Sequence, residues 1–368
     1  MRISDKKYFN NIAGFLFVFI FSLLFKNIFS QSQKIEKYLD GVIVTDIKND
    51  RKDIWVASEG DGIFKFIHSK NKWINFSSSN RRLKQDFFHC IETSKRYIWA
   101  GSTNGLYIYD KKRYKWKRKL FRKGGQFGNW IRALKYDKKN KILWIGRFKF
   151  LTKYNLRRRK YYNYNLTINN NSKTNSIKSL FLDGDSLLWI GTEAGLHKFN
   201  KKGNLRKKRG LYFYDNKTND YFNNEGKQVS VSAIISEQNN IWFGTNEFVT
   251  KENPDFNLGG LFKFNRNIYW TKFGTNNGLN GNGIWDLEIA GNYLWVAVYK
   301  FNPFSKKEMG KGLAIINRAT NKIINVQNPP IPNNVKSLLF DGKNMWLGTN
   351  DGLYKVPLYN NAIANFNN

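Results

Sequence analysis

Short runs of β-branched and aromatic residues alternate with clusters of glycine, asparagine, aspartate and lysine along most of the chain. Such runs are typical of β-strands, and the clusters between them are typical of hairpin turns. One run in each cycle carries a tryptophan followed by small residues, as in residues 188–200, LWIGTEAGLHKFN. This phrase recurs with its marker residues spaced by 44, 45, 45, 53, 53 and 51 positions, at Trp55, Trp99, Trp144, Trp189, Trp242, Trp295 and Trp346.

A repeat of this length, divided into four short strands, is typical of a β-propeller blade. A single four-stranded sheet cannot bury both of its faces, whereas sheets stacked around an axis bury them against each other. We therefore predict an all-β fold, a seven-bladed β-propeller of four-stranded antiparallel blades. The tryptophans are expected to fill the wedges between blades, and the small residues after them to let adjacent backbones approach.

The expected innermost strands align without gaps over four residues, for example VTDI from Val44 and VKSL from Val335. The first and fourth positions are apolar, and the third is small or aspartate, which suits a crowded strand near the axis. The second position varies, and its occupants are Thr45, His89, Arg132, Lys178, Ser232, Trp285 and Lys336.

The first residues are typical of an export signal, because basic residues precede an apolar run at 12–25. This run is short for a membrane span of about 20 residues, which favours a cleaved signal peptide over an N-terminal anchor. We assign residues 1–32 to this segment and residues 33–368 to the propeller. We predict that the two termini pair to close the ring, with residues 34–39 supplying the outer strand of blade seven. Residues 362–366 have a similar pattern and are the alternative.

The chain holds 62 basic against 27 acidic residues, a formal net charge of +35. Such an excess favours a polyanionic partner, but a compositionally biased genome would produce it as well. The single Cys90 and the scattered His68, His89 and His197 give no zinc-like spacing, so we expect no metal, no cofactor and no redox chemistry. Asp183 and Asp185 alone are a weak calcium signal.

The mouth of the central channel is the first place to expect a ligand. Arg132, Lys178 and Lys336 would present cationic donors to a carboxylate or sulfate, with His89 as a polar neighbour. Trp285 and Trp130 would stack on a sugar ring. The alternative is that these side chains lie between blades or face water, because strand alternation alone does not fix their direction.

Three basic runs, at 111–119, 157–160 and 201–209, each follow the third strand of their blade, in blades two, three and four. Equivalent loops of consecutive blades are neighbours, so these runs are expected to form a basic rim patch, although a charge run is often only a solvated turn. The patch would comprise Lys111, Lys112, Arg113, Arg157, Arg158, Arg159, Lys207, Lys208 and Arg209.

An inner V/I-x-S/A-L/I, a short Asp/Gly/Asn turn and LWIGT-x-x-GL-x-K-F/Y-N together resemble the two-component regulator propeller repeat. The resemblance spans residues 41 to about 357. Blade three departs from it at residues 147–153, and insertions at 246–258 and 299–311 split it in blades five and six. Such repeats commonly form extracytoplasmic sensing modules that recognise a ligand, often a glycan fragment. Because no kinase sequence follows the repeats, we expect a free-standing binding protein in the periplasm or secreted.

Three classes of function therefore compete. The favoured one is non-enzymatic recognition of an anionic glycan or other polyanion. A polysaccharide lyase would need a proton acceptor beside the cationic site, and no His-Tyr or paired-carboxylate motif supplies one. A protein-interaction platform would use Phe248, Phe256, Phe301 and Phe304 of the two insertions. Nucleic acid is the least expected partner of an exported chain, and a membrane is expected only if the N-terminal segment is uncleaved.

Overall fold

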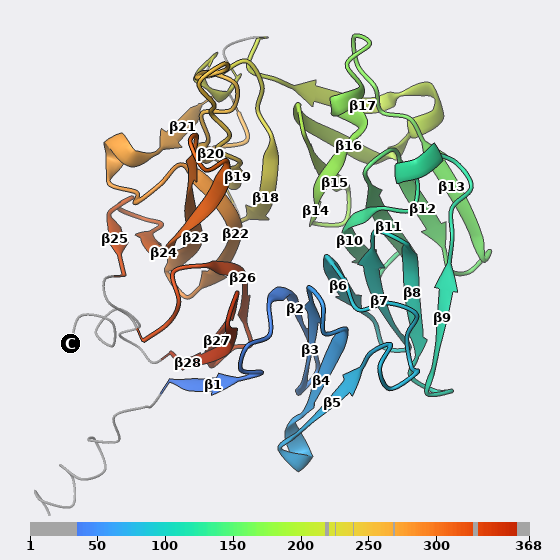
Figure 1. The fold of residues 1–368 in the computed structure, drawn as a ribbon. Coiled ribbons are helices and arrows are strands. Elements are labelled where there is room, and N and C mark those ends of the chain that lie inside the picture. Colours follow the sequence, from blue (N-terminus) through green and yellow to red (C-terminus); the bar gives the residue numbers. More distant parts are fainter. Residues whose placement is uncertain are drawn as a thin grey trace, which may run out of the picture. The chain divides into compact units, whose positions relative to one another are not determined.

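Short, largely buried strands form seven four-stranded antiparallel sheets arranged around a central axis (Figure 1). This computed structural model describes residues 35–217, 221–224, 226–237, 239–267, 269–326 and 330–358. The predicted all-β, seven-bladed propeller is confirmed. The expected signal segment at residues 1–32 and the alternative closing strand at 362–366 lie outside the described residues.

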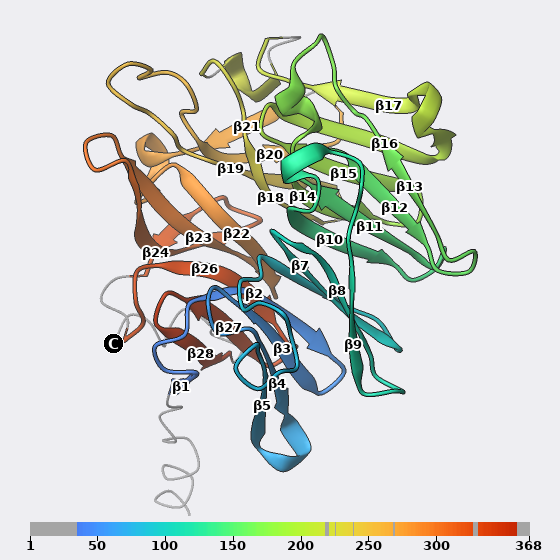
Figure 2. The ribbon, with the colours of Figure 1, turned by 45° about the vertical axis from the view of Figure 1, so that its right-hand side comes forward.

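The innermost strands surround the axis (Figure 2), and they are β2 (Val44–Asp50), β6 (Cys90–Thr93), β10 (Ile131–Asp137), β14 (Ile177–Asp183), β18 (Val231–Ser236), β22 (Gly283–Ala290) and β26 (Val335–Phe340). The second strands carry the marker tryptophans, and they are β3 (Asp53–Ser58), β7 (Tyr97–Ser102), β11 (Ile142–Arg147), β15 (Leu187–Thr192), β19 (Ile241–Thr245), β23 (Tyr293–Asn302) and β27 (Asn344–Thr349). In blade two the inner strand begins at Cys90, two residues later than the sequence alignment indicates.

The third strands are β4 (Ile63–Ile67), β8 (Gly105–Asp110), β12 (Leu151–Asn155), β16 (Gly195–Asn204), β20 (Gly260–Phe264), β24 (Lys307–Asn317) and β28 (Gly352–Pro357). The outer strands are β5 (Lys72–Phe76), β9 (Lys115–Lys119), β13 (Lys160–Tyr164), β17 (Arg209–Tyr214), β21 (Trp270–Phe273), β25 (Ile323–Asn325) and β1 (Glu36–Tyr38). Short 3-10 turns are η1 (His68–Lys70), η2 (Gly125–Phe127), η3 (Ser172–Asn175), η4 (Leu205–Lys207), η5 (Tyr221–Asn224) and η6 (Thr275–Asn277). No helix in the described ranges is long and apolar enough to cross a membrane.

The ring closes through the N-terminal strand. β1 pairs antiparallel with β28, opposing Glu36 to Lys355 and Tyr38 to Leu353, and the two lie side by side in Figure 1. The strand predicted at residues 34–39 therefore completes blade seven. Closure leaves no open sheet edge at the junction of the first and last blades.

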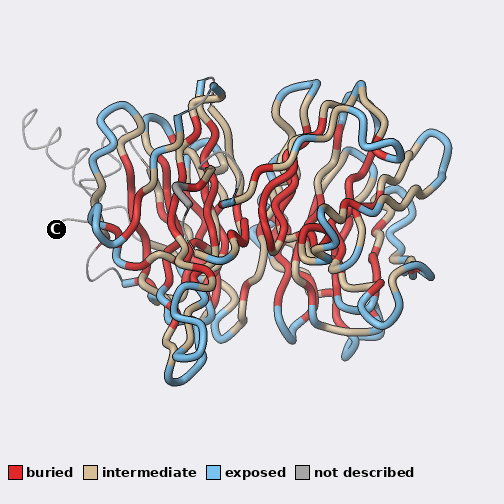
Figure 3. Tube along the Cα trace, turned by 90° about the horizontal axis from the view of Figure 1, so that it is seen from above, coloured by how far each residue is buried: buried red, intermediate tan, exposed pale blue. Residues whose placement is uncertain are grey.

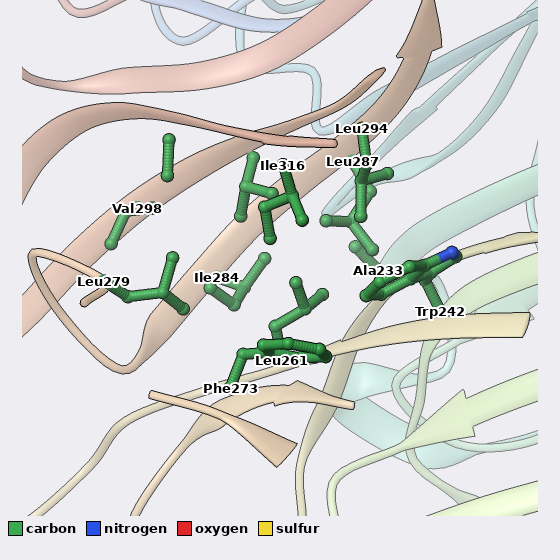
Figure 4. Packing of buried hydrophobic residues seen from close by; sticks show 12 residues of the cluster. Ala233, Trp242, Leu261, Phe273, Leu279, Ile284, Leu287, Leu294, Val298 and Ile316 are labelled. Atoms are coloured by element: carbon green, nitrogen blue, oxygen red, sulfur yellow. The ribbon is translucent and has the colours of Figure 1, made fainter. Parts of the chain in front are cut away.

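The marker tryptophans fill the wedges between blades. All seven are at most 2% exposed, and six of them belong to apolar clusters that join one blade to the next. Figure 4 shows one such interface, where Trp242 of blade five packs with Phe273 and with Ile284 and Leu287 of blade six. Burying a large aromatic side chain contributes about 2–3 kcal/mol each, so these contacts dominate cohesion between blades.

The small residue two positions after each tryptophan allows the next inner strand to approach. A Cβ on Gly146 would lie 2.6 Å from Ile177 Cγ2, and a Cβ on Gly348 would lie 2.5 Å from Val44 Cγ1. Gly101, Gly191 and Gly244 meet equally close neighbours in the following blade. The close approach expected from the sequence is therefore present.

Antiparallel pairing sorts the loops onto two faces. The hairpin face carries the turns between first and second strands and between third and fourth strands. The connection face carries the turns between second and third strands and the links between blades. Exposed residues concentrate in these turns, while the strands are largely buried (Figure 3). The insertion at 299–311 is mostly an extension of β23 and β24 rather than a loop.

Candidate functional site

The second position of the inner strand is a β-bulge in six blades. Pairing with the second strand skips one residue between Val44 and Asp46, and the same shift occurs at the equivalent position of β10, β14, β18, β22 and β26. A bulge removes one residue from the ladder and redirects its side chain. Most residues at this position line a central cavity of about 250 Å³, namely Thr45, His89, Arg132, Ser232, Trp285 and Lys336.

Several of these side chains bind the neighbouring blade. Thr45 Oγ1 donates to the Phe88 carbonyl at 2.7 Å, and Arg132 Nε donates to the Ile177 carbonyl at 2.8 Å. Ser232 Oγ reaches the Ile284 carbonyl in the same way. In each pair the acceptor is the first inner-strand position of the following blade. The bulged side chains thus link adjacent blades at the connection face.

Each nitrogen of the Arg132 guanidinium donates one hydrogen bond within the protein. Its guanidinium donates to Glu193 Oε1 at 2.7 Å and to Ser176 Oγ at 2.8 Å, besides the carbonyl of Ile177. It also lies over the Phe148 ring, 5.0 Å from the centroid. A ligand carboxylate would have to displace Glu193 to form a bidentate contact with this arginine.

The other two predicted cations also have partners. Lys178 does not line the central cavity, and its Nζ donates to Asn246 Oδ1. Burial lowers the pKa of Lys178 to about 8. Lys336 Nζ lies 3.9 Å from Glu59 Oε2. The structure thus brings Arg132 and Lys336 to the channel, while Lys178 turns aside toward blade five.

The predicted aromatic residues are engaged within the protein. Trp285 stacks on Tyr299, with centroids 4.8 Å apart, and its Nε1 donates to Glu308 Oε2 at 3.0 Å. Trp130 stacks on Phe148 at 5.1 Å and does not line the central cavity. These contacts cover part of the ring surface that was predicted to stack on a sugar.

His89 lies beside Trp130, with ring centroids 5.9 Å apart. Burial lowers the pKa of His89, so its imidazole is neutral near pH 7. Its buried Nε2 has no hydrogen-bond partner within the described part of the chain.

Acidic groups lie deeper in the channel, and the sequence analysis did not predict them as site residues. Asp46 accepts from Lys48 Nζ at 2.9 Å and from the Ile91 N–H at 2.8 Å. Asp286 accepts from the Leu338 N–H at 2.8 Å. Both aspartates therefore join their inner strand to the next one. The small-or-Asp pattern at the third position was visible in the sequence, but its meaning depends on the distance between blades.

Burial also changes the protonation of these channel acids. Burial raises the pKa of Asp286 to about 6, and burial together with the charge of Asp286 raises the pKa of Glu288 to about 7. Lys48 opposes both shifts, and nearby carboxylates raise its own pKa despite its burial. No group of three or more His, Cys, Asp or Glu in the described ranges could hold a metal ion.

Neither of the two turn aspartates is arranged as a calcium ligand. The Asp183 carboxylate accepts from Arg266 at 2.5 and 2.9 Å and from Trp189 Nε1 at 3.1 Å. Asp185 pairs with Lys139. Their oxygen atoms serve hydrogen bonds and ion pairs on the hairpin face.

The basic rim residues lie on turns between third and fourth strands of blades two, three and four, on the hairpin face. Lys111 is structural, because its Nζ binds Asp50 and the Ser94 carbonyl. Lys208 Nζ donates to the Thr167 carbonyl at 2.6 Å. The remaining predicted members are exposed and form no ion pair with a described residue, and they are Lys112, Arg113, Arg157, Arg158, Arg159, Lys207 and Arg209.

Blade three departs from the repeat because Arg147 replaces the usual serine or threonine after the tryptophan. In blade four, Thr192 Oγ1 donates to the Gly195 carbonyl at 2.8 Å. Arg147 is fully buried, and its guanidinium donates to Thr152, Asn163 and the carbonyls of Lys123 and Gly128. It therefore anchors the glycine-rich connection into blade three.

The inserted phenylalanines form a small group on the connection face. Phe248 lies 4.7 Å from Phe301 and 6.1 Å from Phe256, measured between ring centroids. Phe301 is buried, whereas Phe248 is 43% and Phe304 is 76% exposed. Two of the four residues predicted for a partner surface thus present substantial ring area to solvent.

No protein-family model matches the chain, and no curated protein matches its sequence. The fold is similar to the extracellular domain of the hybrid two-component system BT4673 from B. thetaiotaomicron, with a TM-score of 0.66 and 17% identity over 88% of this chain and 40% of that one. Virginiamycin B lyase from Staphylococcus aureus has a TM-score of 0.65 and 12% identity over 89% of this chain and 99% of the lyase.

PorZ, a bacterial surface component of the type-IX secretion system of Porphyromonas gingivalis, has a TM-score of 0.59 and 15% identity over 84% of this chain and 46% of PorZ. This chain spans less than half the length of the BT4673 and PorZ structures. At these identities the likeness shows a shared β-propeller fold.

Proposed function

We propose that the chain is an extracytoplasmic binding and sensing propeller that recognises an anionic glycan. The observation that carries this proposal is the set of exposed cations on the hairpin face of three consecutive blades that form no ion pair with a described residue. Cations gathered at one structural position create a focused positive field, which attracts a polyanion. The fold similarity to an extracellular two-component-system domain, together with the export-like N-terminus, supports a location outside the cytoplasm.

The hairpin face supports the proposal better than the channel mouth. At the mouth, Arg132 and Lys336 each have an acidic neighbour, and Lys178 has an amide partner. A ligand there would compete with contacts that join the blades. Apart from Lys111 and Lys208, the rim cations have no such competitor among the described residues.

Retention on an immobilised uronate polysaccharide tests this proposal. Replacing Arg157, Arg159 and Lys207 with alanine is expected to weaken binding by about tenfold or more, because each substitution removes a charge-assisted contact to the polysaccharide. The matched control replaces Lys300, Lys306 and Lys307, exposed lysines of the connection face, and is expected to bind as the wild type does. Retention that is unaffected by salt contradicts an electrostatic mechanism.

A glycan array probed with the same protein would identify the preferred sugar. The lyase alternative predicts a rise in the absorbance of unsaturated uronate products during incubation with the polysaccharide. Binding without such products supports recognition alone, and product formation replaces the proposal with catalysis. The absence of binding to every acidic glycan contradicts the proposed function.

A further inference from the structure

A groove of about 680 Å³ opens on the hairpin face between blades three and four. Its floor is a row of residues paired across the strands of blade three, Trp144 to Lys153 and Lys153 to Tyr162. The far wall is the β16–β17 hairpin of blade four, with Asn204 and Arg206. Its volume lies within the range of about 300–1,000 Å³ that is typical of ligand pockets.

We attribute the groove to an outer-strand aromatic residue that blades one, two, three and five carry and that blade four lacks. In blades one, two, three and five a third-strand aromatic ring faces an outer-strand ring, and the pair packs with the tryptophan of the preceding blade. Ring centroids of these pairs are 5.0 Å apart for Tyr109–Trp116 and 4.5 Å for Phe264–Trp270. In blade four the corresponding pair is Phe199 and Leu211.

A second interface supports this explanation. Blade six also has an aliphatic pair, Ile316 and Ile323, and a cavity of about 560 Å³ opens between blades five and six. The charge of that cavity is different, because its only lining cation, Arg318, pairs with its lining acid, Glu237. The groove between blades three and four is therefore distinguished by its charge.

Six cationic side chains and one carboxylate line the groove, and the carboxylate, Asp185, is paired with Lys139. Lys201 is paired with Asp137 at 2.7 Å in a nearly buried contact. The other four cations form no ion pair with a described residue, and they are Lys153, Arg158, Lys202 and Arg206.

The same groove offers ring faces and neutral hydrogen-bonding groups. Tyr162 and Tyr164 line it from the outer strand of blade three, and Arg206 lies over the Tyr162 ring at 6.0 Å. Asn140, Asn155 and Ser186 supply polar atoms that suit hydroxyl groups. In its floor, the buried Nε1 of Trp144 has no acceptor within the described part of the chain.

From these features we infer that the groove between blades three and four binds a short acidic oligosaccharide. Arg158, Lys202 and Arg206 hold its carboxylates or sulfates, and Tyr162 lies against a sugar ring. Arginine forks match carboxylate and sulfate geometry, and aromatic faces suit the apolar face of a sugar. This inference rests on the proposed function, because it locates the sugar subsite within the basic surface.

Titration calorimetry of the full chain with a short oligogalacturonate tests the inference. The triple variant Arg158→Ala, Lys202→Ala and Arg206→Ala is expected to weaken binding by about tenfold or more. The matched control, Lys300→Ala, Lys306→Ala and Lys307→Ala, removes the same charge from exposed positions of the connection face outside the groove, and its affinity is expected to stay close to that of the wild type.

A variant that keeps every charge separates shape from electrostatics. Leu211→Trp introduces the indole that blades one, two and five carry at this position. The larger ring is expected to extend past Trp144 and Phe199 into the groove and to abolish binding, while the urea midpoint shows that the fold persists. Tyr162→Ala provides a second test in which the groove stays open but loses its ring, with an expected loss of about tenfold.

Each outcome decides between the two proposals. Equal losses in the groove and control triples, or full binding by both Leu211→Trp and Tyr162→Ala, overturn the groove while leaving recognition of anionic glycans intact. If the wild-type chain binds no acidic sugar, both proposals are overturned. Equal affinity for single-stranded DNA of the same charge, lost in the same variants, overturns the assignment to a sugar. Binding of a neutral oligosaccharide with equal affinity overturns the role of the cations.

Discussion

Tyr38 of the N-terminal strand stacks on Trp346 of the last blade, with ring centroids 5.8 Å apart and an interplanar angle of 30°. The same tyrosine ring lies 5.8 Å from Phe66 and 5.9 Å from Trp73 of blade one. One side chain therefore contacts both blades at the junction where the ring closes. The three-residue strand β1 contributes packing at this junction as well as backbone pairing.

Replacing Tyr38 with alanine is expected to lower the free energy of unfolding by about 2 kcal/mol, because a half-buried ring and its contacts in two blades are lost. Urea denaturation measures this loss. Tyr269→Ala, at a ring that is 68% exposed, is the control and is expected to change stability by less than about 0.5 kcal/mol. Equal effects of the two substitutions would show that the junction does not depend on this ring.

Replacing Arg147 with methionine is expected to lower the free energy of unfolding by about 3 kcal/mol or more. The substitution keeps much of the side-chain volume but leaves the carbonyls of Lys123 and Gly128 without their arginine donor, while Asn163 Oδ1 keeps only its hydrogen bond from Thr152. Urea denaturation measures the stability, and limited proteolysis at the connection into blade three measures the local effect. Exposed Arg157→Met is the control, and protease resistance equal to that of wild type would contradict an anchoring role.

Gly348→Ala is expected to lower the free energy of unfolding by about 1–3 kcal/mol, because its Cβ would meet Val44 Cγ1 at 2.5 Å. Combining it with Val44→Ala removes the atom that clashes. The double variant is therefore expected to lose less stability than the sum of the two single losses, by more than about 0.5 kcal/mol. If the two single losses simply add in the double variant, the close contact between Gly348 and Val44 is not the cause of the lost stability.

The pKa of Glu288, raised by burial to about 7 from 4.5, predicts a pH-dependent penalty on the fold. The unfolded carboxylate ionises first as the pH rises, so the folded state binds more protons between these two values and stability falls across that window. Glu288→Gln removes the penalty. It is expected to raise the free energy of unfolding by about 1 kcal/mol near pH 8, after discounting for solvent in the channel, and to have little effect near pH 4. Urea denaturation at the two pH values measures the difference, and an equal gain at both contradicts the assignment.

The repeat of tryptophans and the alternation of apolar residues were sufficient to predict the blades, their number and the role of residues 34–39. These features depend on local patterns that recur, and Trp189 with Gly191 has the same meaning in every blade. The position of the basic runs on one face also followed from strand order alone. Antiparallel connectivity leaves no other place for a turn between third and fourth strands.

The candidate sites were less predictable, for physical reasons. The directions of the Arg132 and Lys178 side chains depend on a β-bulge that cannot be predicted from residue types. Their partners, Glu193 and Asn246, come from loops of other blades. We attribute the groove between blades three and four to Leu211, which is smaller than its aromatic counterparts in blades one, two, three and five. A missing volume is visible only when the surrounding side chains are placed in space.

The bulges of the inner strands have a consequence for how the channel changes between related sequences. Arg132 of β10 and Trp285 of β22 are skipped in the strand pairing and belong to none of the apolar clusters, so replacing either residue leaves the apolar interfaces between blades unchanged. A mutation at such a position alters the chemistry of the pore at the cost of polar links to the next blade, such as that from Arg132 to the Ile177 carbonyl, while the tryptophan layer stays in place. Variation can accumulate there one substitution at a time, without compensating changes in the tryptophan layer.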